Sequence, residues 1–105
     1  MKVLIKDPGL PFYRADVKNK LKEFQAIVGG YIECEFATMI DGEEIDMIID
    51  EEGRLKHKPV SLRNTAYGDI YGTAVFCRIE GEGFVGLTEE QMDILEERLD
   101  VFVDD

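Results

Sequence analysis

The sequence has no tryptophan, one histidine, two cysteines and three prolines among its 105 residues, and its bases are few. Twelve Lys and Arg residues stand against 23 Asp and Glu residues, which gives a formal net charge of −11. This shortage of bases argues against a general nucleic-acid binder, because neutralising phosphates needs clustered Lys and Arg. It also argues against docking on anionic lipid. No apolar run approaches the roughly 20 residues that cross a bilayer, and the apolar stretch near the N-terminus is too short for a signal peptide.

The shortage of Cys and His limits the metal and thiol chemistry. Two cysteines without a secretion signal predict reduced thiols in a cytoplasmic protein. Structural zinc needs four N or S ligands, and Cys34, Cys77 and His57 are the only three such residues. A Cys–His nucleophile pair would need His57 beside an exposed thiol with a lowered pKa. Cys34 shares one face of an expected strand with Ile32 and Phe36, so we expect a buried core thiol instead, and we predict no metal and no cofactor.

Other catalytic signatures are also missing. The acids of residues 41–52 lack the order of a calcium loop, and turn formation explains them better. The pair Gly29 and Gly30 follows an expected helix instead of opening one, so it does not predict a phosphate site. Carboxylates are abundant, but no spacing marks a catalytic pair. We therefore predict no catalytic residue and favour a protein that is not an enzyme.

The charges that are present lie in blocks along the chain. Residues 41–53 carry seven acids and no base, residues 54–79 carry five bases and one acid, and residues 80–105 carry ten acids and one base. Such blocks form either contact surfaces or solvated loops and helix faces. The basic block, with its neighbouring tyrosines, is the candidate binding surface, formed by Arg54, His57, Lys58, Arg63, Asn64 and Tyr67. The competing interpretation is that these bases pair with the acidic blocks of the same chain or of a second copy.

Hydrophobic periodicity predicts the elements of the first half of the chain. We expect a strand at residues 2–5 and an amphipathic helix at residues 15–28 that ends at Gly29. Alternation predicts strands at residues 31–37 and 44–50, joined by a turn at Asp41 and Gly42 into an antiparallel hairpin.

The second half is predicted to contain a helical turn at residues 61–66, a central strand at residues 70–79 and a helix at residues 88–99. Gly72 marks a bulge or a close backbone approach in that strand. Thr88 and Gln91 form a capping box, and Met92, Leu95 and Leu99 are the expected buried stripe. Residues 101–103 are either a short strand, open to pairing with a second copy as a homodimer, or an apolar plug. The sum is one α+β domain over residues 1–105, a mainly antiparallel sheet of about four strands with two helices on one face.

Several short segments carry a resemblance. They are MKVLIKDPG at residues 1–9, VGGYIE at 28–33, DEEGRL at 50–55, Asn64, and DIYGTA at 69–74. In this order they resemble the DUF3846 family of small uncharacterised proteins from bacteria, phages and mobile elements. The chain departs from the family at LKHKP (residues 55–59), where similar proteins are expected to have a turn like Gly-Leu-Pro. The resemblance implies a mobile-element or phage origin and carries over no functional residue.

Three functions are open from the sequence. The first is a cytoplasmic accessory protein that is not an enzyme and binds another protein. The second is an acidic nucleic-acid mimic that inhibits a DNA-binding defence enzyme. The third is an enzyme or small-ligand binder with a pocket formed by Phe12, Tyr13, Arg14, Asn64 and Tyr67.

Overall fold

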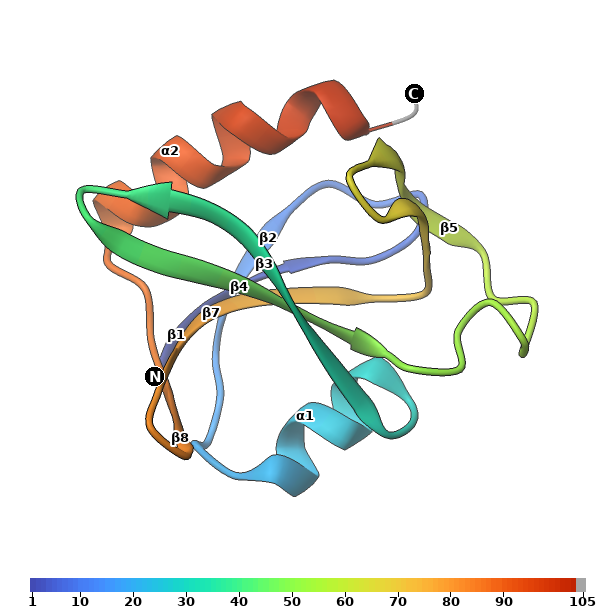
Figure 1. Ribbon diagram of the computed structural model, residues 1–105, viewed down its shortest axis with the longest axis horizontal. Coiled ribbons are helices and arrows are strands. Elements are labelled where there is room, and N and C mark those ends of the chain that lie inside the picture. Colours follow the sequence, from blue (N-terminus) through green and yellow to red (C-terminus); the bar gives the residue numbers. More distant parts are fainter. Residues whose placement is uncertain (104–105) are drawn as a thin grey trace.

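An antiparallel sheet forms the centre of the molecule, and a helix lies on each side of it (Figure 1). The computed structural model describes residues 1–103, so Asp104 and Asp105 of the acidic C-terminal block lie outside the described residues. The helices are α1 (Leu21–Val28) and α2 (Glu89–Leu99), and α2 continues into a 3-10 turn at Asp100–Phe102. The strands are β1 (Lys2–Lys6), β2 (Tyr13–Asp16), β3 (Ile32–Ile40), β4 (Glu43–Asp50), β5 (Val60–Thr65), β6 (Gly68–Tyr71), β7 (Ala74–Glu80) and β8 (Gly83–Val85).

The strand order of the main sheet is β2-β1-β7-β4-β3, with β8 paired to β7. Every pairing is antiparallel, and β5 and β6 form a separate hairpin. The predicted α+β class is therefore confirmed. The sheet has six strands instead of about four, because β2 and β8 are too short to leave a clear alternation in the sequence.

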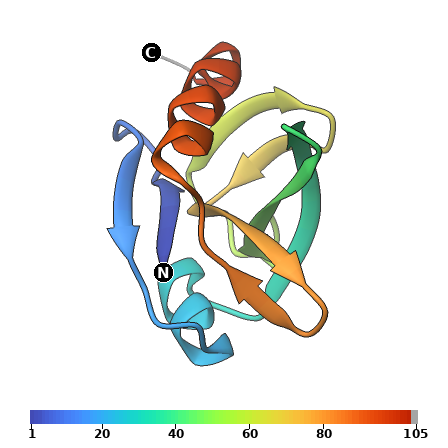
Figure 2. The same cartoon turned by 90° about the vertical axis from the view of Figure 1, so that its left-hand side faces the viewer.

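The two helices cover opposite faces of the sheet, so the prediction that they share one face is wrong. Val3 of β1 packs in a cluster with Phe24 of α1, whereas the next residue, Leu4, packs in a cluster with Leu95 of α2. Successive side chains of a strand point to opposite faces. Figures 1 and 2 both place α2 and α1 on opposite sides of the strands. The central strands are apolar on both faces, which is why two separate cores form.

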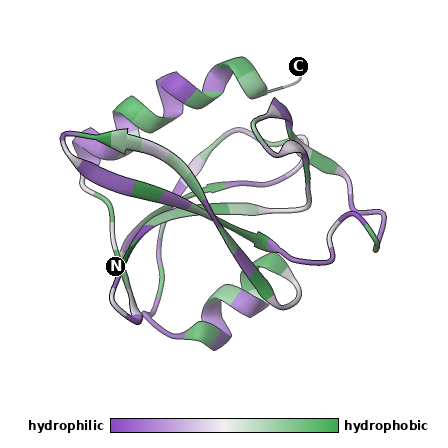
Figure 3. Ribbon diagram, in the orientation of Figure 1, coloured by the Kyte–Doolittle hydropathy of each residue, from purple (hydrophilic) through white to green (hydrophobic). Residues whose placement is uncertain are grey.

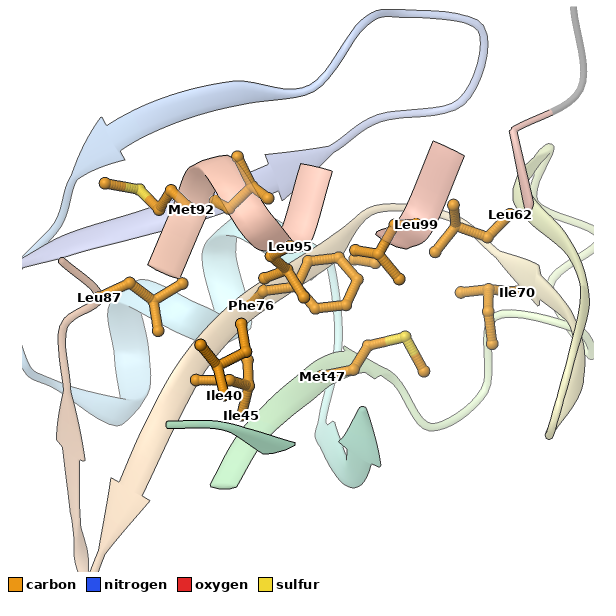
Figure 4. Close-up of a cluster of buried hydrophobic side chains, with 12 residues drawn as sticks. Ile40, Ile45, Met47, Leu62, Ile70, Phe76, Leu87, Met92, Leu95 and Leu99 are labelled. Carbon is orange, nitrogen blue, oxygen red and sulfur yellow. The ribbon is translucent and has the colours of Figure 1, made fainter. Parts of the chain in front are cut away.

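The core on the α2 side is the larger one. Leu95 and Leu99 of α2 lie against Phe76 of β7, and Leu62 and Ile70 reach the same cluster from the β5–β6 hairpin (Figure 4). The predicted buried stripe of α2 is confirmed, and the bands of hydrophobic and hydrophilic residues that alternate along this helix are visible in Figure 3.

The capping box that begins α2 is also confirmed. The backbone N–H of Gln91 donates to Oγ1 of Thr88 at 3.0 Å, and the backbone N–H of Thr88 donates to Oε1 of Gln91 at 2.9 Å. After α2, residues 101–103 do not form a strand: Phe102 and Val103 pack on the core, as the apolar-plug interpretation expects, whereas Val101 is exposed. Among residues 1–103, neither helix has the length and apolar character needed to cross a membrane.

The predicted helix at residues 15–28 is too long at its N-terminal end. Residues Tyr13–Asp16 form β2, which pairs with β1 from Ile5↔Tyr13 to Lys2↔Asp16. The helix begins only at Leu21, and its N-cap residue Lys20 makes no capping hydrogen bond through its side chain. Pairing with a distant strand decides the state of residues 13–16, which local periodicity cannot show. The C-terminal end is as predicted, with Gly29 in the left-handed conformation at a φ of 80°.

Two predictions for residues 61–79 are wrong. The expected helical turn at residues 61–66 is strand β5, and the expected single strand at residues 70–79 is divided into β6 and β7, which belong to different sheets. Gly72 causes the division, because its φ of 92° turns the chain out of the strand. A Cβ at this position would lie 2.9 Å from Cδ of Lys58, so the close neighbour of Gly72 is a lysine side chain and not the predicted backbone.

The β3–β4 hairpin is confirmed, with both Asp41 and Gly42 at positive φ in its turn. The predicted burial of Cys34 is wrong: Cys77 is buried, but Cys34 is exposed. The reason is the position of β3 at the end of the strand order. An edge strand has a neighbour on one side only, and alternation along the sequence does not reveal that the strand lies at the edge.

Candidate functional site

Asp50, the last residue of β4, is the centre of a cluster of ion pairs. Its side chain is 1% exposed, and its Oδ2 lies 2.6 Å from Nζ of Lys58 and 2.9 Å from Nζ of Lys56. The backbone N–H of Glu52 donates to Oδ1 at 2.9 Å. Burial by itself raises the pKa of Asp50, but the two ammonium groups and this N–H outweigh burial and lower the pKa to about 2. Asp50 is therefore an ionised structural residue.

The same two lysines donate hydrogen bonds to backbone carbonyls at the C-terminal end of α1. Nζ of Lys58 donates to the carbonyl oxygen of Val28 at 2.7 Å, and Nζ of Lys56 donates to that of Gly29 at 3.1 Å. The last carbonyls of a helix lack partners within the helix and carry its negative dipole end, so ammonium donors are favourable there. Lys56 and Lys58 thus pair inside the chain, as the competing interpretation of the basic block expects for these two residues.

The six predicted binding residues lie in different surroundings. His57 is exposed in a turn at a φ of 56°, and the backbone N–H of Asn64 donates to Oδ1 of Asp69 at 3.0 Å. Arg63 lies 3.5 Å from the same carboxylate group. Two of the six, Arg54 and Tyr67, line a common cleft. Whether the others contact a partner stays a prediction.

This acidic cleft has a volume of about 510 Å³ and lies between the β3–β4 hairpin and β6. Its lining is Glu33, Glu35, Ile49, Asp50, Glu51, Arg54, Tyr67, Gly68, Asp69, Ile70 and Tyr71. Five of these residues are acids, one is a base and two are tyrosines. Sequence reasoning missed Glu33 and Glu35, although the alternation of β3 does place both on the same face of the strand. The cleft itself depends on the β5–β6 hairpin, which the sequence did not predict.

The carboxylates of the cleft crowd one another. Burial raises the pKa of Glu33, and hydrogen bonding to Glu35 and the negative charges of Glu35 and Glu51 raise it further. Within residues 1–103, no Lys or Arg side chain forms an ion pair with Glu33, Glu35 or Glu51. Such a site favours a cation over an anion, because a positive charge reduces the repulsion between the carboxylates.

The backbone beside the cleft is open. The N–H of Glu51 donates to the carbonyl oxygen of Tyr31 at 2.9 Å. Hydrogen-bonded and non-hydrogen-bonded residues alternate along an antiparallel pair, so the odd-numbered residues at the start of β3 are the ones whose backbone groups bond to β4. The N–H and C=O groups of Ile32 and Cys34 therefore point away from the sheet. Farther along the edge, side chains cover the outward carbonyls: the hydroxyl of Tyr67 donates to Phe36 O at 2.7 Å and Arg98 donates to Met39 O at 2.6 Å.

The pocket suggested for residues 12–14 is not assembled as predicted. Phe12 lines a cavity of about 310 Å³ together with Lys6 and Asp100. Arg14 does not line it, because its guanidinium binds three carboxylates of α2, those of Glu89, Asp93 and Glu96. Tyr67 lies at the β3 edge instead.

Metal binding has no candidate in the part of the chain that the structure describes: no three or more His, Cys, Asp or Glu side chains there are grouped to hold an ion.

Three of the segments that carry the resemblance, residues 28–33, 50–55 and 69–74, meet at the Asp50 cluster. A Cβ on Gly30 would lie 2.6 Å from Oδ1 of Asp50, and a Cβ on Gly53 would overlap the carbonyl oxygen of Tyr71. A family model described as a domain of unknown function (DUF3846) matches residues 1–100. The chain belongs to the DUF3846 family. No curated protein and no solved structure matches it. Three of the short motifs of this DUF3846 chain thus surround a structural ion-pair cluster, and the acidic cleft lies beside that cluster.

Proposed function

We propose that this DUF3846 protein is a cytoplasmic protein-binding module that is not an enzyme, of mobile-element or phage origin, and that it binds its partner at the open start of β3. The family resemblance supports the origin. The two free thiols, Cys34 and Cys77, fit a reducing compartment.

The open edge of β3 beside the acidic cleft is the observation that carries the proposal. Native proteins usually protect the edges of their sheets, because free backbone groups pair readily with other chains. Here Tyr67 and Arg98 cover the carbonyls farther along β3, but within residues 1–103 no group covers the outward backbone groups of Ile32 and Cys34. Tyr31, which precedes this stretch, is 69% exposed. Exposed aromatic side chains are typical of interfaces between proteins.

The nucleic-acid-mimic alternative has less support. A mimic needs carboxylates that are free to stand in for phosphates on one surface. In this fold three acids of α2 bind Arg14, Asp50 binds two lysines, and Glu43 binds Arg78. The small-ligand alternative has less support too, because its predicted residues are spread over separate places.

Cys34 provides a direct test, because it is an exposed thiol on the open edge and Cys77 is buried. A photo-crosslinking maleimide on Cys34 probes the edge in a lysate of the native host. The maleimide is attached at mildly alkaline pH, because partial burial and nearby carboxylates raise the pKa of this thiol. The matched control is Cys34→Ser with Glu97→Cys, which moves the probe to an exposed position of α2. We expect one protein to crosslink from Cys34, to be displaced by unlabelled protein, and to be missing from the control. Equal crosslinking from both positions, or none from Cys34, would contradict the proposal.

A further inference from the structure

We propose that the segment bound at this edge is a short basic β-strand, which adds to β3 and places Lys or Arg side chains at alternate positions into the acidic cleft. The inference rests on the proposed function and specifies the chemical class of the partner segment.

The backbone contribution comes from Ile32 and Cys34. Their N–H and C=O groups point outward in the same direction, so an extended chain can pair with both residues at the spacing of an ordinary ladder. The hydroxyl of Tyr67 occupies the next outward carbonyl, that of Phe36. The added strand is therefore expected to pair over this first part of β3.

The side-chain contribution comes from Glu33 and Glu35. Residues directly opposite each other on paired strands share a face, so the residues of an added strand opposite Glu33 and Glu35 point into the cleft. Tyr67 and Tyr71 line the same cleft, and aromatic rings bind ammonium and guanidinium groups. In the added strand, the residues that alternate with those pointing into the cleft lie on the same face as Ile32. Ile32 packs on the α1-side core, so apolar side chains suit those positions.

The remaining charges of the cleft also favour a cationic segment. Asp50 is already paired with two lysines, and Asp69 holds Arg63 and the N–H of Asn64. Arg54 is the single base in the lining, whereas three carboxylates form no ion pair within residues 1–103, those of Glu33, Glu35 and Glu51. Cationic side chains supplied by a partner would offset their repulsion, whereas an acidic segment would increase it.

The test uses a fluorescent eight-residue peptide of alternating Lys and Val, with binding to the full chain followed by fluorescence anisotropy. Three matched peptides serve as controls. In the first, Glu replaces Lys. The second carries N-methyl groups on the Val amides, and the third carries them on the Lys amides. In an added strand only one of these two sets of amides points at β3, the Val set in antiparallel and the Lys set in parallel addition. We expect one N-methylated peptide to lose binding and the other to retain it, and the Glu peptide not to bind.

The protein side is tested with Glu33→Gln and Glu35→Gln together. We expect at least about fivefold weaker binding of the Lys–Val peptide, from cross-strand charge pairs. The control pair Glu82→Gln and Glu97→Gln removes the same charge from exposed positions that do not line the cleft and is expected to leave binding unchanged.

The outcomes separate this inference from the proposed function. If both N-methylated peptides bind like the parent, the peptide is held by charge alone, as a free polyamine would be, and strand addition is wrong. If a Cys34-crosslinked partner is found but binding to that partner is unaffected by the Gln variants, the basic segment is wrong and the protein-binding module stands. If neither the peptide nor a crosslinked partner binds, both are wrong.

Discussion

Asp50 joins three separate parts of the chain: the end of β4, the loop that carries Lys56 and Lys58, and the C-terminal carbonyls of α1. A buried carboxylate is costly unless donors surround it, and here two ammonium groups and one N–H do so. Removing the carboxylate leaves the two lysines facing each other without a counter-charge.

We therefore expect Asp50→Asn to lower the free energy of unfolding at pH 7 by about 2 kcal/mol, measured by urea denaturation. Because the pKa of Asp50 falls from 3.8 to about 2 on folding, its contribution is present above about pH 4 and is lost as the pH falls toward 2. The wild-type protein should lose this stability over that window, and the variant should not. A loss below about 0.5 kcal/mol, equal to that of the exposed control Glu82→Gln, would contradict the structural role.

Asp46 of β4 shows the opposite behaviour. It is a buried residue, and burial raises its pKa to about 6, together with a hydrogen bond and repulsion from Glu44, while the N–H of Ile79 lowers it. The folded protein therefore takes up a proton that the unfolded chain releases, and stability falls as the pH rises from about 4 to 6.

For this reason we expect Asp46→Asn to raise the free energy of unfolding at pH 7 by roughly 1 kcal/mol and to have little effect at pH 4. Urea denaturation at the two pH values checks this expectation. An equal destabilisation at both pH values would show that the carboxyl group is needed whatever its protonation state and would overturn the interpretation.

At the scale of single residues, the sequence predicts which charged residues matter better than it predicts where each of them lies in the fold. It identifies the basic block and its acidic neighbours, but Lys58 is engaged inside the chain, while Glu33, which is not among the predicted binding residues, lines the cleft. The ion pairs that form, such as that of Asp50 with Lys58, depend on the course of the loop between β4 and β5. No spacing in the sequence encodes that course.

Among the elements, those held by local chemistry are predicted well. The capping box at Thr88 and the turn at Asp41 and Gly42 act over a few residues, and both α2 and the β3–β4 hairpin are present as expected. By contrast, β2 exists because it pairs with β1 and because Arg14 binds α2, and β5 exists because it pairs with β6. Long-range pairing of this kind overrides local periodicity.

The loop between β4 and β5 is held against β6 by Gly53. A Cβ at Gly53 would overlap the backbone carbonyl oxygen of Tyr71, whereas a Cβ at Gly83 would meet its nearest neighbour, Glu80 O, at an ordinary 3.8 Å. We expect Gly53→Ala to lower the free energy of unfolding by about 1 to 3 kcal/mol, because the loop and β6 must separate. The matched control Gly83→Ala should change it by less than about 0.5 kcal/mol. Equal effects of the two variants in urea denaturation would contradict the close approach.

For the whole molecule, the net charge of −11 understates how the charges are organised. Several carboxylates form ion pairs with Arg14, Lys56 and Lys58, whereas within residues 1–103 the cleft residues Glu33, Glu35 and Glu51 form none. The two helices occupy opposite faces of the sheet, and β3 is left as an edge. The acidic cleft and the open backbone thus lie together at one place, and this arrangement supports a docking surface for a basic strand.

Amide hydrogen exchange at β3, followed by NMR, tests this docking surface most directly. In the free protein the amides of Ile32 and Cys34 should exchange faster than those of Glu33 and Glu35, which bond to β4. Adding the alternating Lys–Val peptide should slow exchange at Ile32 and Cys34 by about tenfold or more and leave α2 unchanged. If Ile32 and Cys34 are already as protected as Glu33 and Glu35, or if the peptide leaves their exchange unchanged, the β3 edge is not the docking surface.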